Sequence, residues 1–131
     1  MANEIPESVR RFVSMHVSSI ELLEVLLLLR QSADKEWRAE DVARVIGSSM
    51  MSIRDRLANL SARNLVAARE GSDDIWYRYA PEEDLARVIE EVAALYKERR
   101  LTVINMIYAR QAAGDIESFA DAFRIFKKEG D

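Results

Sequence analysis

The chain has 131 residues, 49% of them hydrophobic, and a formal net charge of −4 at pH 7. This length fits one domain, or one domain with an added dimerisation element. The absence of cysteine excludes disulfides, thiolate metal sites and cysteine nucleophiles, and it fits a reducing cytoplasm. The first residues lack the basic segment, apolar run and cleavage site of a signal peptide.

Two helices are expected in the first 36 residues. Residues 6–15 can form a short amphipathic helix through Val9, Phe12 and Val13. Residues 20–29 are the most apolar run, but a helix of ten residues spans only about 15 Å, roughly half of a bilayer core. We therefore expect a helix buried on nearly all sides, with a capping box of Ser18 and Glu21 at its start.

A pair of helices joined by a tight turn is predicted next. The helix at 39–46 should stop at Gly47, because glycine suits the left-handed conformation that ends many helices. The hydroxyls of Ser48 and Ser49 can cap the following helix. Its apolar residues recur in steps of three and four, which places them on one face. They are Met50, Ile53, Leu57 and Leu60. Asn64 marks its end.

A β-hairpin is predicted after this helix pair. Residues 65–69 and 75–79 read as strands on either side of a turn at 70–74, and Trp37 should begin a very short strand that pairs with them. Helix, turn, helix and hairpin together resemble the winged helix-turn-helix of bacterial transcription factors. Residues 60–66 have the form of the usual helix-to-wing junction. The aromatic side chains of this region are expected to pack in the hairpin and the domain core, and they are Trp37, Trp76, Tyr77 and Tyr79.

A long helix is predicted to open at Pro81 and to continue to about Gln111, a length of ~45 Å. One apolar stripe runs along it from Leu85 to Ile107, and a different face is apolar near residues 101–108. A helix that is apolar on two sides must be covered twice. One cover can be its own domain, and the other is most simply a second copy of the chain.

A final helix should be capped by Ser118, with phenylalanines on one face. We expect a homodimer whose contacts come from these two terminal helices and the N-terminal helix. The candidate dimerisation residues are Leu101, Ile104, Tyr108, Phe119 and Phe123. Ile104→Glu should weaken the dimer if this face is the seam, because the substitution buries an unpaired charge.

The layout as a whole is similar to the MarR family of bacterial regulators, whose terminal helices make a dimer. By this resemblance the chain divides into N-terminal helices (1–36), a winged helix-turn-helix (37–81) and C-terminal dimerisation helices (82–131). Members of that family commonly carry an Asp-x-Arg motif at the wing tip and a Leu-Thr pair at its end. Here those positions read Glu70-Gly71-Ser72-Asp73-Asp74 and Ala80-Pro81. The PadR family is a less similar alternative, matched through the long helix after its wing.

The resemblance implies a DNA-binding transcriptional regulator that acts as a homodimer. Serine and asparagine can hydrogen-bond base edges, and arginine can bind guanine or phosphate. The candidate DNA contacts on the second helix of the pair and on the hairpin are Ser48, Met51, Ser52, Arg54, Arg56, Asn59, Arg63, Arg69 and Arg78. The acidic wing tip formed by Glu70, Asp73 and Asp74 is expected to stay off the DNA.

A second interpretation is a winged-helix module that binds another protein and no specific DNA. It remains open because residues 38–81 hold seven arginines against six acidic residues, which is a weak basic excess. An enzyme is not expected. His16 is the single histidine, so neither a nucleophile–base pair nor a zinc cluster is visible. We expect no cofactor and no metal, while the operator, any small-molecule effector and the direction of regulation stay open.

Overall fold

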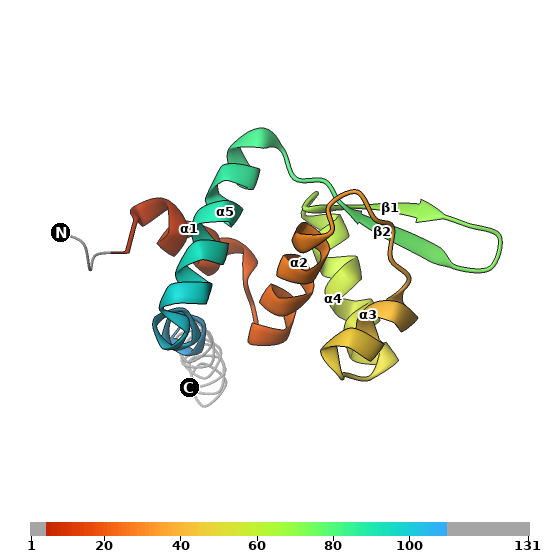
Figure 1. Cartoon of the computed structure of the whole chain (residues 1–131), viewed down its shortest axis with the longest axis horizontal. Helices are drawn as coiled ribbons and strands as arrows, with labels where there is room; N and C mark the ends of the chain where they lie inside the picture. Colours follow the sequence, from red (N-terminus) through yellow and green to blue (C-terminus); the bar gives the residue numbers. More distant parts are fainter. Residues whose placement is uncertain (1–4, 110–131) are drawn as a thin grey trace, which may run out of the picture.

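The computed structural model describes residues 5–109 (Figure 1). Its helices and strands are α1 (Glu7–His16), α2 (Ile20–Gln31), α3 (Ala39–Ile46), α4 (Met50–Ala62), β1 (Val66–Glu70), β2 (Ile75–Tyr79) and α5 (Glu83–Glu98). Residues 100–109 are helical again. This order confirms the predicted mainly helical fold with one antiparallel hairpin, a winged helix-turn-helix.

Helix α2 is the centre of the core. Leucine and valine fill nearly its whole circumference, and its fully buried residues are Leu22, Leu23, Val25, Leu26 and Leu29. It packs against α3, α4 and β2, while α1 packs against α5 on the other side of the molecule (Figure 1). The expectation of a helix buried on nearly all sides is therefore confirmed. Among the described residues no single helix could span a membrane, and α1 and α2 meet that test only as a pair, across a 111° bend.

The hairpin is antiparallel, with Val66 opposite Tyr79 and Glu70 opposite Ile75. Trp37 adds the predicted short third strand, because its backbone exchanges two hydrogen bonds of 2.8 Å with Tyr77. The side chains of Trp37 and Tyr77 are both buried in the core. The pairing fixes the hairpin to the helical domain, so that the wing projects from one end of the molecule (Figure 1).

Three boundaries differ from the sequence-based expectation. The cap of α2 is Ser19, whose hydroxyl accepts from the Leu22 amide at 3.0 Å, and the predicted capping box of Ser18 and Glu21 is wrong. The first strand runs one residue later than predicted and includes Glu70. Helix α5 begins at Glu83, because Glu82 still has an extended backbone with ψ of 157°.

The prediction of one uninterrupted helix after the hairpin is also wrong. Helix α5 ends at Glu98, and Arg99 leaves the helical region with φ of −135° and ψ of 59°. In a continuous helix Arg99 would fall on the buried stripe, four residues after Leu95 and four before Val103. On the two sides of this break, Ile89, Val92 and Val103 are all fully buried. The predicted final helix with Ser118, Phe119 and Phe123 lies outside the described residues.

Candidate nucleic-acid interface

The turn between α3 and α4 has the geometry that a helix-turn-helix requires. Gly47 adopts the left-handed conformation with φ of 81°, and its amide donates to the Ala43 carbonyl at 2.8 Å. Ser49 caps α4, because its hydroxyl accepts from the Ser52 amide at 3.2 Å. Asn64, with φ of 61°, turns the chain from α4 into the hairpin. All three assignments made from the sequence are confirmed.

The outward face of α4 lies opposite its buried residues Ile53, Leu57 and Leu60. Met51 on this face is 77% exposed, and Arg54, Asp55, Ala58 and Ala62 are exposed with it. Arg54 forms no ion pair or side-chain hydrogen bond with any residue between 5 and 109, so its charge is available.

A groove of about 300 Å³ separates α4 from the hairpin. Its lining residues are Ala39, Arg54, Asp55, Ala58, Asp74, Ile75 and Tyr77. One free guanidinium and two carboxylates thus lie beside each other in the space between the helix and the wing.

One flank of α4 is bound to α2 through Glu21. The Glu21 carboxylate accepts from the Ser48 hydroxyl at 2.6 Å and from Arg56 Nε at 3.1 Å. The Ser52 hydroxyl donates to the same carboxylate oxygen as Arg56. These hydrogen bonds lower the pKa of Glu21, with the bond from Ser48 the largest cause, so the carboxylate stays ionised at neutral pH. Three of the predicted DNA contacts therefore share one internal anion.

The end of α4 is bound to α1 through Arg63. Its guanidinium donates to Asn59 Oδ1 at 2.9 Å and to the Met15 carbonyl at 2.6 Å. Arg63 Nη1 also lies 3.2 Å from His16 Nδ1, and the His16 ring packs 5.0 Å from the ring of Phe12. Two further predicted DNA contacts, Asn59 and Arg63, are thus part of a link between helices.

The hairpin places its two candidate arginines differently. Arg69 forms a bidentate ion pair with Glu36, at 2.8 and 3.0 Å, beside the ring of Trp76. Arg78 is exposed and forms no ion pair within residues 5–109, although its charge adds to the hydrogen bond from Arg69 in lowering the pKa of Glu36. Gly71 leaves room for Trp76, since a Cβ atom there would lie 2.9 Å from the indole Nε1.

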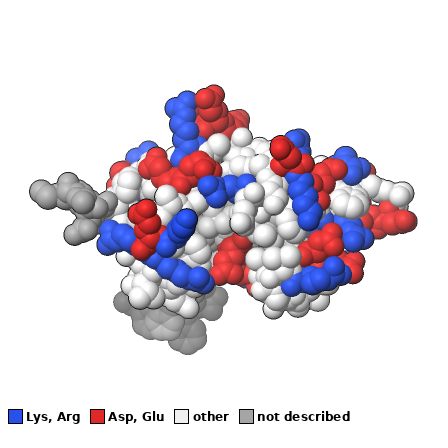
Figure 2. All heavy atoms as spheres, viewed as in Figure 1, with Lys and Arg blue, Asp and Glu red and all other residues white. Residues whose placement is uncertain are grey.

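The charges on the face seen in Figure 2 are mixed. Basic and acidic side chains alternate over it, and acidic ones lie at the far end of the hairpin (Figure 2). Phosphate contacts supply much of the affinity for DNA. This face has no broad basic surface that could make them. A few individual arginines would have to do so.

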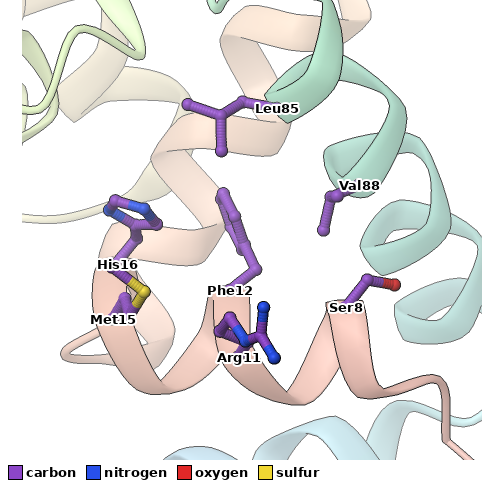
Figure 3. A pocket seen from close by; sticks show the side chains of 7 residues that line it. All are labelled: Ser8, Arg11, Phe12, Met15, His16, Leu85 and Val88. Carbon is purple, nitrogen blue, oxygen red and sulfur yellow. The ribbon is translucent and has the colours of Figure 1, made fainter.

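A pocket of about 240 Å³ opens between α1 and α5 (Figure 3). Phe12, Leu85 and Val88 form its apolar wall, and Met15 and His16 form the edge nearest the Arg63 link. The pocket is therefore joined to the end of α4 by two contacts of one arginine.

The helical segment 100–109 has an apolar face that the described chain leaves open. Val103 and Ile107 are fully buried, whereas Leu101 is 74% and Tyr108 57% exposed. Ile104 is half-buried. These last three are the predicted dimerisation residues within the described range, and Phe119 and Phe123 lie outside it.

Sequence reasoning missed Glu21, which contacts residues 27 to 35 positions away along the chain. No spacing within α2 signals that contact, since only the packing of α2 on α4 creates it. Within residues 5–109 no group of three or more His, Cys, Asp or Glu side chains could hold a metal ion.

No protein-family profile matches the sequence, and no curated protein matches it. Solved structures do match. One is the homodimeric winged helix-turn-helix DNA-binding domain of a possible ArsR-family transcriptional regulator from Mycobacterium bovis. It is 26% identical and covers 76% of this chain and 93% of its own, with a TM-score of 0.54.

Two more distant matches show the same fold. The transcriptional regulator HlyU from Vibrio vulnificus is 20% identical and covers 69% of this chain and 88% of its own, with a TM-score of 0.52. The adhesin competence repressor AdcR from Streptococcus pyogenes is 15% identical, but it covers 93% of this chain and 89% of its own, with a TM-score of 0.52.

Proposed function

We propose that this protein is a DNA-binding transcriptional regulator that acts as a homodimer in the cytoplasm. The observation that carries the proposal is the outward face of α4, which the described chain leaves uncovered beside a projecting hairpin. A helix so placed can enter a major groove while the wing lies toward the flanking backbone. The likeness to a DNA-binding domain from Mycobacterium bovis supports this assignment by fold.

Arg54 is the DNA contact that we place first. It lies on the exposed side of α4 and has no described partner to give up, so binding a phosphate or a guanine breaks no existing bond. Ser48, Ser52 and Arg56 must be shared with Glu21, and Asn59 and Arg63 with the α1 link. Met51, Arg69 and Arg78 complete the proposed interface, with Arg69 leaving Glu36 to reach a phosphate.

The proposed dimer uses the open apolar face of residues 100–109. Leu101 and Tyr108 are large apolar side chains exposed on one helical segment, and a contiguous exposed apolar patch is typical of an interaction site. A second copy of the chain would cover them. This arrangement of terminal helices around a winged domain is MarR-like in layout. The proposed dimer is supported by the likeness to the homodimeric domain from Mycobacterium bovis.

We place a small-molecule effector in the α1–α5 pocket. A ligand that displaces Met15 or His16 would pull on Arg63 and hence on the end of α4. Its chemistry is left to experiment.

One observation favours a second function, the winged-helix module that binds a protein. The outward face of α4 carries Met51, Ala58 and Ala62 around Asp55. Apolar groups with one carboxylate suit a protein partner better than a phosphate backbone.

Binding of genomic DNA fragments at two salt concentrations separates the two functions. A regulator should enrich particular fragments over random DNA, and its affinity should fall steeply as salt rises. A protein-binding module should enrich none, and a pull-down should return a protein instead. Failure to prefer any fragment at either salt concentration would refute the proposed function.

A further inference from the structure

Glu21 is surrounded by the kinds of donor that bind phosphate oxygens. Two hydroxyls, from Ser48 and Ser52, and the guanidinium of Arg56 all donate to its carboxylate. Hydroxyls and arginines are the side chains that commonly contact DNA phosphates. The carboxylate thus occupies one flank of α4 as an internal anion.

The contact between Glu21 and Arg56 can open. The Arg56 side chain is 32% exposed and that of Glu21 is 24% exposed, so water reaches both groups. Ion pairs with this degree of exposure contribute little net free energy, because solvent competes for both partners. A DNA phosphate arriving beside α4 can therefore compete for the same arginine.

We propose that Glu21 competes with DNA for Arg56, Ser48 and Ser52, so that α2 limits the affinity of α4 for DNA. The inference rests on the proposed DNA-binding function and adds a residue that sets its strength. While Glu21 holds Arg56, the pair is neutral and contributes no charge to phosphate binding. Glu21 also repels any phosphate that approaches this flank.

The test compares Glu21→Gln with Glu24→Gln in full-length protein, on the genomic fragment that wild type binds best. Both variants lose one negative charge from α2. Glu24 is the matched control, because it lies one turn further along α2 and accepts from Tyr96 and Arg100 instead of from α4. Glu21→Gln should tighten binding about two- to fivefold at low salt, the equivalent of one exposed ion pair. The log–log salt slope should steepen by about one as Arg56 becomes free. Glu24→Gln should change neither quantity.

A double variant identifies the route of the effect. Adding Arg56→Ala to Glu21→Gln should abolish the gain in affinity, because the released arginine is gone. If the gain persists in full, release of Arg56 is not its source and the proposed competition for this arginine is wrong. Weaker binding by Glu21→Gln, or an unchanged salt slope, would also overturn it, since Glu21 would then hold Arg56 in the pose that binds DNA.

Urea unfolding of each variant shows whether the fold is retained. If Glu21→Gln does not fold, Glu21→Asp replaces it, because the shorter side chain keeps the charge at the start of α2 but cannot reach all three donors. Glu21→Asp should bind DNA more tightly than wild type, but by a smaller factor than the one expected for Glu21→Gln. Binding weaker than that of wild type would overturn the inference. If wild type prefers no fragment, the proposed function itself fails. If wild type binds and the Glu21 variants show no gain, this inference alone fails.

Discussion

The hydroxyl of Tyr79 is a buried polar atom without a hydrogen-bond partner among the described residues. Burial, followed by the charge of Glu90, raises the pKa of Tyr79 to about 12. A raised pKa means that the folded state keeps the proton longer than the unfolded state. The stability of the fold is then complete below about pH 10, the ordinary tyrosine value, and declines as pH rises toward 12.

Tyr79→Phe should therefore leave the fold as stable as wild type at pH 7, or up to about 1 kcal/mol more stable, because it removes an unsatisfied buried hydroxyl. It should also reduce the loss of stability above pH 10. Urea unfolding at pH 7 and at pH 11 measures both effects. Tyr108→Phe is the control, since Tyr108 is 57% exposed. A loss of stability in Tyr79→Phe at pH 7 would mean that the hydroxyl has a partner after all.

Arg54→Ala should weaken DNA binding and make the log–log salt slope shallower by about one, if Arg54 contacts a phosphate. Arg87→Ala removes the same charge from α5, where Arg87 pairs with Glu83. It should leave the slope unchanged. Titration of the preferred fragment at several salt concentrations gives both slopes. Equal slopes for the two variants would remove Arg54 from the interface.

Single residues show where sequence reasoning stops. The left-handed Gly47 and Asn64, and the cap at Ser49, were predictable because local backbone geometry decides them. The contacts of Arg63 with α1 and of Glu21 with α4 were not predictable, because they form only when these helices pack together. Six candidate DNA contacts in or next to α4 differ in whether they have a partner. Arg54 is unpaired within residues 5–109, while Ser48, Ser52, Arg56, Asn59 and Arg63 are bonded to neighbours.

Among the elements, the helical segment 100–109 supplies the proposed dimer face. Leu101→Glu should shift the protein from dimer to monomer, because the side chain is exposed in one chain and the proposed dimer would bury the new charge without a partner. Sedimentation at micromolar concentration measures the shift. The variant should keep the wild-type unfolding midpoint when both proteins are measured as monomers. Wild type that sediments as a monomer would contradict the dimer itself.

The hairpin is the element whose tip carries the least favourable charge for DNA. Asp73 is exposed, and Asp74 uses a carboxylate oxygen to accept from the Ile75 amide at 3.0 Å. We expect Asp73→Asn to leave DNA affinity nearly unchanged, because a tip beyond a Debye length of about 10 Å at 0.1 M salt is screened. Asp74 is left intact in this variant, because it lines the groove beside Arg54. Titration at low salt tests this. Markedly tighter binding would place the tip next to phosphates, and weaker binding would mean that the Asp73 carboxylate makes a favourable contact.

Element boundaries were predictable to within one or two residues wherever a cap, a glycine or β-forming residues marked them. The break at Arg99 was not, because the apolar stripe continues with the same helical spacing on both sides of it. The sequence pattern records which residues are buried. It does not record that the helix breaks between them.

At the scale of the whole molecule, the net charge of −4 gives no general attraction to DNA, and the face seen in Figure 2 mixes both signs of charge. We therefore expect the affinity to depend on a few arginines. Two copies of α4 in a dimer double the number of these contacts. In a dimer that binds DNA, the two recognition helices enter grooves about one helical turn apart, ~34 Å. Dimerisation and DNA binding should therefore be lost together when the apolar face at residues 100–109 is disrupted.

The most direct measurement is a hydroxyl-radical footprint of the wild-type protein on its preferred genomic fragment. We predict two protected segments whose centres are about one helical turn apart, with Leu101→Glu giving no such pair at the same concentration. A single protected segment, uniform protection along the duplex, or a fragment that cannot be found at all would contradict a homodimer that reads DNA with two copies of α4.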